Sequence, residues 1–118
     1  MRVNVSTEWT PTQQEFDAFA RVSGDDNPIH VDPAFSARTA FGRTVCHGMF
    51  LYARLWGLVT EARSGTRQVS QSMMFPNPCY AGEPLKLTVE GDAPGRIAMR
   101  AVRRTDGAVL FAGEAEVA

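Results

Sequence analysis

The segment HGMFLYARLWGLVTEAR, residues 47–63, decides the fold, because apolar side chains cover nearly every face of the helix that it predicts. A helix that is apolar all round is buried. Beyond residues 64–65 the pattern changes to β, with segments near 67–76, 85–90, 96–103 and 109–117 separated by turn residues. One buried helix followed by antiparallel strands predicts an α+β fold in which a sheet curls around that helix.

Ahead of this helix, the stretch SGDDNPIHVD, residues 23–32, sets an acid and an imidazole five residues apart around a turn. The pair Asn27-Pro28 favours a turn, since the residue before proline is kept out of the α region. This turn directs the side chains of Asp25 and His30, which can both accept a proton near neutrality and together suit the activation of water. Turns contain such residues without catalysis as well, so the pair alone leaves a structural role open.

Two helix starts flank this stretch. Thr10 is predicted as the N-cap of a helix, with Pro11 at its first position and Gln13 completing a capping box, and the helix is expected to end near residues 23–24. Asp32 precedes Pro33 and repeats the signal, so we favour an N-cap role for Asp32 over a catalytic one.

Two motifs in this order resemble the MaoC-like hydratase family, which includes (R)-specific enoyl-CoA hydratases and some 3-hydroxyacyl dehydratases. They are Asp-x-Asn-Pro-x-His-x-Asp at residues 25–32 and His-Gly-Met at residues 47–49, and the segment FPNPCYAGE at residues 75–83 is a further match. The resemblance implies a hotdog fold and the hydration of a trans-2-enoyl thioester by Asp25 and His30. It also implies that the backbone N–H of Gly48 polarises the thioester carbonyl.

Physical arguments add to the site that the resemblance implies. Gly48 lies at the start of the buried helix, where unpaired N–H groups and the helix dipole favour negative charge. Asn27 is a supporting residue that orients Asp25 or the substrate, or simply forms the turn. His47 is expected to hold the helix entrance rather than to move protons. Trp56 either shortens the acyl tunnel or fills core volume.

Composition limits the other possibilities. A chain of 118 residues with 44% apolar residues fits one globular domain, residues 1–118, with a single core. The net charge of −1 gives no basis for nucleic-acid binding. No signal-peptide pattern and no apolar run of about 20 residues is present, so we expect a cytoplasmic protein without membrane contact. Cys46 and Cys79 have neither metal-type spacing nor the density of a disulfide scaffold, which predicts reduced thiols.

The predicted partner is an acyl-CoA or acyl-carrier-protein thioester, with no cofactor and no metal. Arginine suits phosphate, so the candidates for contacts with the carrier's phosphates are Arg63, Arg67, Arg103 and Arg104, although an ordinary solvated surface explains each of them as well. An open sheet also leaves an edge strand uncovered. A homodimer or a larger homo-oligomer would cover it.

Three other functions use the same residues. His30, Asp32 and His47 imitate the ligands of a non-haem iron oxygenase, but only a short helical segment separates them. Cys46 beside His47 suggests a thiol nucleophile, although adjacent residues on a helix point in different directions. A hotdog acyl-CoA thioesterase or a non-catalytic acyl-binding module shares the fold and a similar tunnel, and only the presence of both Asp25 and His30 favours the hydratase.

Overall fold

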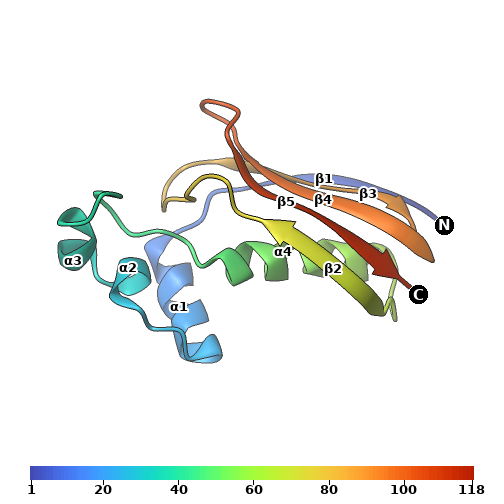
Figure 1. Cartoon of the computed structure of the whole chain (residues 1–118), viewed down its shortest axis with the longest axis horizontal. Coiled ribbons are helices and arrows are strands. Elements are labelled where there is room, and N and C mark those ends of the chain that lie inside the picture. Colours follow the sequence, from blue (N-terminus) through green and yellow to red (C-terminus); the bar gives the residue numbers. More distant parts are fainter.

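One antiparallel sheet of five strands forms the body of the protein, whose computed structural model describes all 118 residues (Figure 1). The spatial order of the strands is β1-β3-β4-β5-β2. Their bounds are β1 (Arg2–Trp9), β2 (Gln68–Met74), β3 (Leu85–Asp92), β4 (Gly95–Arg103) and β5 (Val109–Val117). The order leaves β1 and β2 as the two edges, and the predicted α+β arrangement is confirmed.

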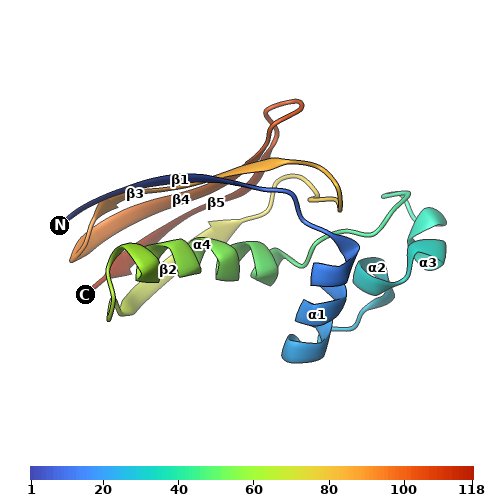
Figure 2. The ribbon, with the colours of Figure 1, turned by 180° about the vertical axis from the view of Figure 1, so that it is seen from behind.

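The helix α4 (Gly48–Ala62) lies along one face of the curved sheet (Figures 1 and 2). Its buried side chains Leu51, Leu55 and Val59 are spaced four residues apart, so they form one stripe that packs into the core. The prediction of a buried helix is confirmed for the side of α4 that faces the sheet. A single sheet covers only one side of α4, and Met49 on another side is 52% exposed.

The inner face of the sheet supplies the other half of the core. Alternate residues point to one face of a strand, and the inward-facing positions of the central strands are almost entirely buried and apolar. They include Leu85, Leu87 and Val89 of β3 with Ile97, Met99 and Ala101 of β4. The alternation that the sequence shows in β3 is thus the contact surface for α4.

Three short helices gather beyond the N-terminal end of α4 (Figure 2). They are α1 (Gln13–Ser23), α2 (Pro28–Val31) and α3 (Pro33–Ala37). Asp32 caps α3 by accepting a hydrogen bond from Phe35 N at 3.0 Å, which confirms the predicted N-cap. None of the helices has the length and apolar character that crossing a membrane requires.

The predicted start of α1 at Thr10 is wrong by two residues. Thr12 is the N-cap: its Oγ1 accepts from Glu15 N at 3.2 Å, and the Glu15 carboxylate accepts from Thr12 N at 3.0 Å. The reciprocal pair is therefore Thr12 with Glu15 rather than Thr10 with Gln13. Pro11 stays outside the helix because its carbonyl accepts a hydrogen bond from Gly82 N at 2.7 Å.

This difference is testable by a pair of substitutions. We expect Thr12→Ala to lower the free energy of unfolding by about 1 kcal/mol, because Glu15 N loses its side-chain acceptor and keeps only the backbone oxygen of residue 12. The matched variant Thr10→Ala removes no hydrogen bond of the capping box and is expected to leave the stability of the parent protein unchanged. Urea denaturation of the three proteins measures both effects. A larger loss in Thr10→Ala would contradict the assignment.

Candidate active site

The turn between α1 and α2 brings Asp25 and His30 together. Asn27 is the N-cap of α2, where its side chain accepts from Ile29 N at 3.2 Å, and its own N–H lies 3.4 Å from Asp25 Oδ1. His30 is buried on α2, and its Nε2 lies 3.7 Å from Asp25 Oδ2. That distance is too long for a direct hydrogen bond, so both atoms are available to one donor placed between them.

The orientation of the His30 ring is set by a backbone carbonyl. Nδ1 of His30 lies 2.7 Å from the backbone oxygen of Val45, which accepts a hydrogen bond from it. In the neutral ring the proton is then on Nδ1, and Nε2 carries the free lone pair that faces Asp25. The ring is therefore held as a base at Nε2. Val45 O is a residue contact that the sequence analysis missed, since a backbone carbonyl leaves no motif.

His47 connects this turn to α4. It is the N-cap residue of α4, yet its side chain makes no cap bond and instead donates from Nε2 to the backbone oxygen of Asp25 at 2.9 Å. Its ring stacks on that of His30, with centroids 3.8 Å apart and planes inclined by 22°. Burial, together with the neighbouring His30, lowers the pKa of His47 below its usual value, against the opposing effect of the hydrogen bond to Asp25. A neutral, buried ring of this kind positions Asp25.

Gly48 is the first residue of α4. N–H groups in the first turn have no acceptor within a helix, and none of the hydrogen bonds outside the regular elements uses that of Gly48. A Cβ at this position would lie 2.7 Å from Cε1 of Phe75, so any larger residue would displace that ring. The N–H of Gly48 is thus a free donor at the positive end of a helix of fifteen residues.

A cavity of about 310 Å³ adjoins Gly48. Mostly apolar residues line it: Phe41, Val45, Cys46, Gly48, Leu51, Phe75, Pro76, Asn77, Pro78, Cys79 and Leu110. Val45 thus both lines the cavity and holds His30. Trp56 is not among the lining residues and packs against the hydrophobic core instead, so the structure does not support the tunnel role that the sequence suggested for it.

The two cysteines in the cavity wall are free and buried thiols, as the sequence predicts. A hydrogen bond with the Cys79 thiol, and then burial, raise the pKa of Cys46 far above its usual value. Cys46 Sγ also lies 3.3 Å from the backbone oxygen of His47 rather than at the His47 ring. The pairing of a thiol nucleophile with a histidine base is therefore absent.

The three residues suggested as iron ligands, His30, Asp32 and His47, do not form a metal site either. The Asp32 carboxylate is occupied as a helix cap, and Asp25 takes its place in a group with His30 and His47 whose ligand atoms lie within 4.8 Å of one another. The two imidazole rings are stacked, however, and lone pairs in nearly parallel planes do not converge on one ion. The geometry suits proton transfer better than metal binding.

None of the four arginines proposed for phosphate contacts lines the cavity. Arg63 donates to Thr66 and to the oxygen of Ala118 at the far end of α4, where Arg67 also pairs with the backbone of Ala118. Arg103 is buried in ion pairs, and Arg104 pairs with Glu8.

Comparison with known proteins fits this arrangement. The sequence profile of the family described as "MaoC like domain" matches residues 1–110. An (R)-specific enoyl-CoA hydratase from Aeromonas caviae is 36% identical over 110 residues, which cover 87% of this chain and 82% of that protein. The chain belongs to the MaoC-like family.

Two further comparisons refine the position within the MaoC-like family. A 3-hydroxybutyryl-CoA dehydratase from Methylorubrum extorquens is 37% identical over 75 residues, which cover 61% of this chain and 47% of that protein. The solved structure of the (R)-hydratase from A. caviae, described as involved in PHA biosynthesis, superimposes with a TM-score of 0.88 at 31% identity, covering 98% of this chain and 93% of that one. The predicted hotdog fold is confirmed.

The buried His47 gives a pH-dependent stability. Its pKa in the folded protein lies below that in the unfolded chain, so the unfolded chain binds more protons as the pH falls. Stability from neutral His47 is complete above about pH 6.5 and is lost as the pH falls towards the folded-state pKa. We expect the free energy of unfolding to decrease between about pH 7 and pH 5, and to decrease less in His47→Phe. Urea denaturation across this range tests the prediction, which parallel curves for the two proteins would contradict.

Proposed function

We propose that this protein is an (R)-specific enoyl-thioester hydratase that also catalyses the reverse dehydration of 3-hydroxyacyl thioesters. The observation that carries the proposal is the placement of two proton acceptors, Asp25 Oδ2 and His30 Nε2, 3.7 Å apart on a segment that hydrogen bonds through His47 to the start of α4. The names of the relatives, an (R)-specific enoyl-CoA hydratase and a 3-hydroxybutyryl-CoA dehydratase, support the reaction and the stereochemistry.

In the proposed reaction a water molecule binds between Asp25 and His30. Its oxygen forms a bond to C3 of the trans-2-enoyl thioester while the pair accepts one of its protons. The π electrons of the C2=C3 bond move towards the thioester carbonyl, and the pair returns a proton to C2. The product carries the hydroxyl at C3 and the added hydrogen at C2, and the reverse sequence expels water.

Gly48 is proposed to stabilise the charge that develops on the thioester oxygen. Its free N–H and the positive end of α4 would both act on that oxygen, and fixed donors aimed at developing charge are usually a large contribution to catalysis. The adjoining apolar cavity would receive the acyl chain. The carrier is coenzyme A or an acyl carrier protein, since the relatives include enzymes named for either one.

Substitution of the acid and the base tests the reaction. We expect Asp25→Asn and His30→Gln to lower kcat for crotonyl-CoA hydration by at least about 100-fold, because each removes one proton acceptor. Asp26→Asn is the matched control: it makes the same change at the neighbouring exposed residue and is expected to keep the parent rate. Loss of the enoyl absorbance measures hydration, and a thiol reagent run in parallel detects thioester hydrolysis.

The outcomes separate the candidate functions. Loss of absorbance without thiol release, abolished in both variants, supports the hydratase. Release of thiol that persists in Asp25→Asn would indicate a thioesterase instead. An absence of both signals with crotonyl-CoA and longer enoyl thioesters would contradict catalysis and leave an acyl-binding module.

We further propose a homodimer in which two β2 edges and two α4 helices meet. The outer edge of β2 has no strand beside it, and Val69, Met74 and Phe75 in or next to β2 are large apolar residues that are exposed. The outward side of α4 exposes Met49 as well. Strand edges and apolar surface of this kind are normally covered in a stable protein.

A charge on β2 tests the dimer. We expect the parent protein to have the mass of a dimer or a multiple of it by light scattering, and Met74→Glu to shift it to the monomer, because a carboxylate would be buried at the joined edges. Val22→Glu is the control, since Val22 belongs to α1 rather than β2 and is more exposed than Met74. A monomeric parent protein would contradict the proposal.

The cytoplasm is the compartment that we propose. Both cysteines are free thiols and no disulfide is formed, which agrees with a reducing environment.

A further inference from the structure

The loop between the cavity-lining residues Phe41 and Val45, which we call the rim of the cavity, contains an arginine that the sequence analysis did not single out. Arg43 follows the cavity-lining residue Phe41 by two positions and precedes Val45 by two. Its guanidinium carbon is 3.9 Å from the centre of the Tyr80 ring, and Nη2 is 3.5 Å from Glu83 Oε2. The side chain is still 53% exposed. Arg43 is therefore held in place and open to solvent at the same time.

A second arginine beside it has a different role. Arg103 forms ion pairs with Glu83 at 3.2 Å and Asp106 at 2.8 Å, and donates to the oxygen of Pro78 at 2.5 Å. Its side chain is only 11% exposed. Arg103 is the closer partner of Glu83, and Arg43 approaches that carboxylate with one nitrogen, Nη2, at 3.5 Å. The guanidinium of Arg43 retains donors for another anion.

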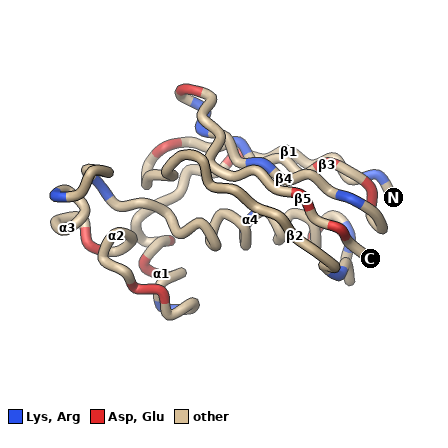
Figure 3. The backbone as a smooth tube through the Cα atoms, viewed as in Figure 1, with Lys and Arg blue, Asp and Glu red and all other residues tan.

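The backbone fixes this arginine relative to the site. Tyr80 pairs with Val45 in an isolated antiparallel bridge, and Cys46 N donates to the oxygen of Cys79 at 2.7 Å. Tyr80, whose ring lies under Arg43, is thus joined to the segment that leads into Gly48. Arg43 and Gly48 are five positions apart, so their α carbons lie no more than about 17 Å from each other. Figure 3 marks basic residues in blue near α3 and along the loop that follows it.

We propose that Arg43, supported by Tyr80, binds the phosphate of the 4′-phosphopantetheine arm of the substrate. This inference rests on the proposed function, because coenzyme A and acyl carrier proteins both attach the acyl thioester to that arm and have a phosphate at its other end. With the thioester carbonyl at Gly48, the arm leaves the cavity past the rim. A planar guanidinium donates two parallel hydrogen bonds to a phosphate, and an arginine already stacked on a ring loses little freedom on binding.

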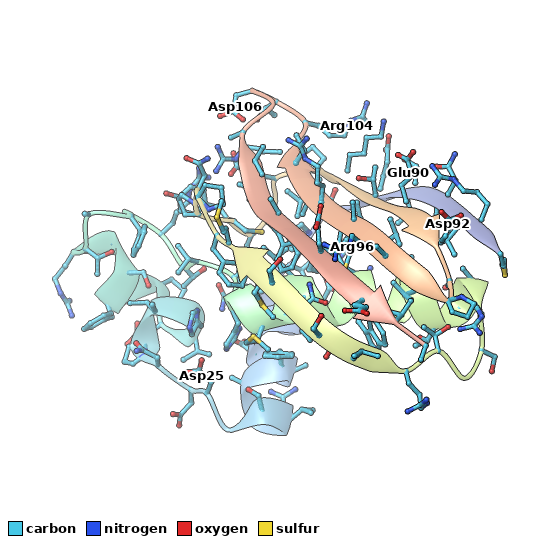
Figure 4. All side chains as sticks on the ribbon, turned by 45° about the vertical axis from the view of Figure 1, so that its right-hand side comes forward. Asp25, Glu90, Asp92, Arg96, Arg104 and Asp106 are labelled. Atoms are coloured by element: carbon cyan, nitrogen blue, oxygen red, sulfur yellow. The ribbon has the colours of Figure 1, made fainter.

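Three crotonyl thioesters separate the phosphate from the rest of the substrate: those of coenzyme A, of 4′-phosphopantetheine and of pantetheine, which lacks the phosphate. We expect Arg43→Gln to raise KM about tenfold for the first two and to leave KM for the third unchanged, with kcat preserved throughout. Arg96→Gln is the matched control. Arg96 of β4 is an exposed arginine that pairs with Glu114 of β5, and it lies far from Asp25 in Figure 4. Thermal unfolding checks that each variant is folded.

Tyr80 provides a second measurement. Tyr80→Phe keeps an aromatic face under Arg43 and is expected to retain the parent KM for all three substrates. Tyr80→Leu removes the face and is expected to raise KM for the two phosphate-containing substrates only. The same change in both Tyr80 variants would contradict a supporting role for the ring.

Several outcomes would overturn the proposal. They are an Arg43→Gln effect of equal size on all three substrates, an effect restricted to the coenzyme A thioester, or equal KM values of the parent protein for the second and third substrates. Calorimetric titration with free 4′-phosphopantetheine and free pantetheine measures the contribution of the phosphate to binding without requiring catalysis. Tighter binding of the phosphate form by the parent protein, lost in Arg43→Gln, supports the proposal even if no hydration is detected.

Discussion

The hydrogen bond from His47 to the backbone oxygen of Asp25 is the contact on which the candidate site depends. It joins the turn after α1 to the first residues of α4, two segments that are more than twenty positions apart in the sequence. It fixes the backbone of Asp25, whose carboxylate is 56% exposed, to the residue before Gly48. The base has its own link to the same segment, because His30 Nδ1 donates to the oxygen of Val45. The acid, the base and the proposed oxyanion donor are therefore all held by the residues that lead into α4.

The stacking of His30 on His47 affects the charge that the two rings can carry. A positive charge on one ring disfavours a charge on the other, and the more deeply buried ring of His47 is the one whose pKa is lowered. The lowered pKa favours a neutral His47 ring beside His30, whose Nε2 faces the Asp25 carboxylate. The ring of His47 serves as an apolar neighbour with a single hydrogen bond.

The sequence predicts much of this arrangement and misses particular parts for physical reasons. The order of helix and strands, the Asp32 cap and the proximity of Asp25 to His30 all follow from local signals. The start of α1 does not, because Thr10 and Thr12 are equally good caps until the hydrogen bond to Pro11 is known. The role of Val45 depends on a carbonyl, and that of Arg43 on a ring thirty-seven residues away in the chain. The sequence leaves two roles open for Trp56, because periodicity does not tell which face of α4 borders the cavity.

Two cysteines lie in the wall of the cavity that is proposed to receive the acyl chain. A cysteine in that position could undergo acyl exchange, in which a protein sulfur displaces the carrier and keeps the acyl group. The nucleophile in that exchange is a thiolate. The hydrogen bond with the Cys79 thiol and burial both favour the protonated form of Cys46. The thiol of Cys46 is thereby a poor nucleophile towards a thioester, which keeps acyl exchange at this residue from competing with the proposed hydration.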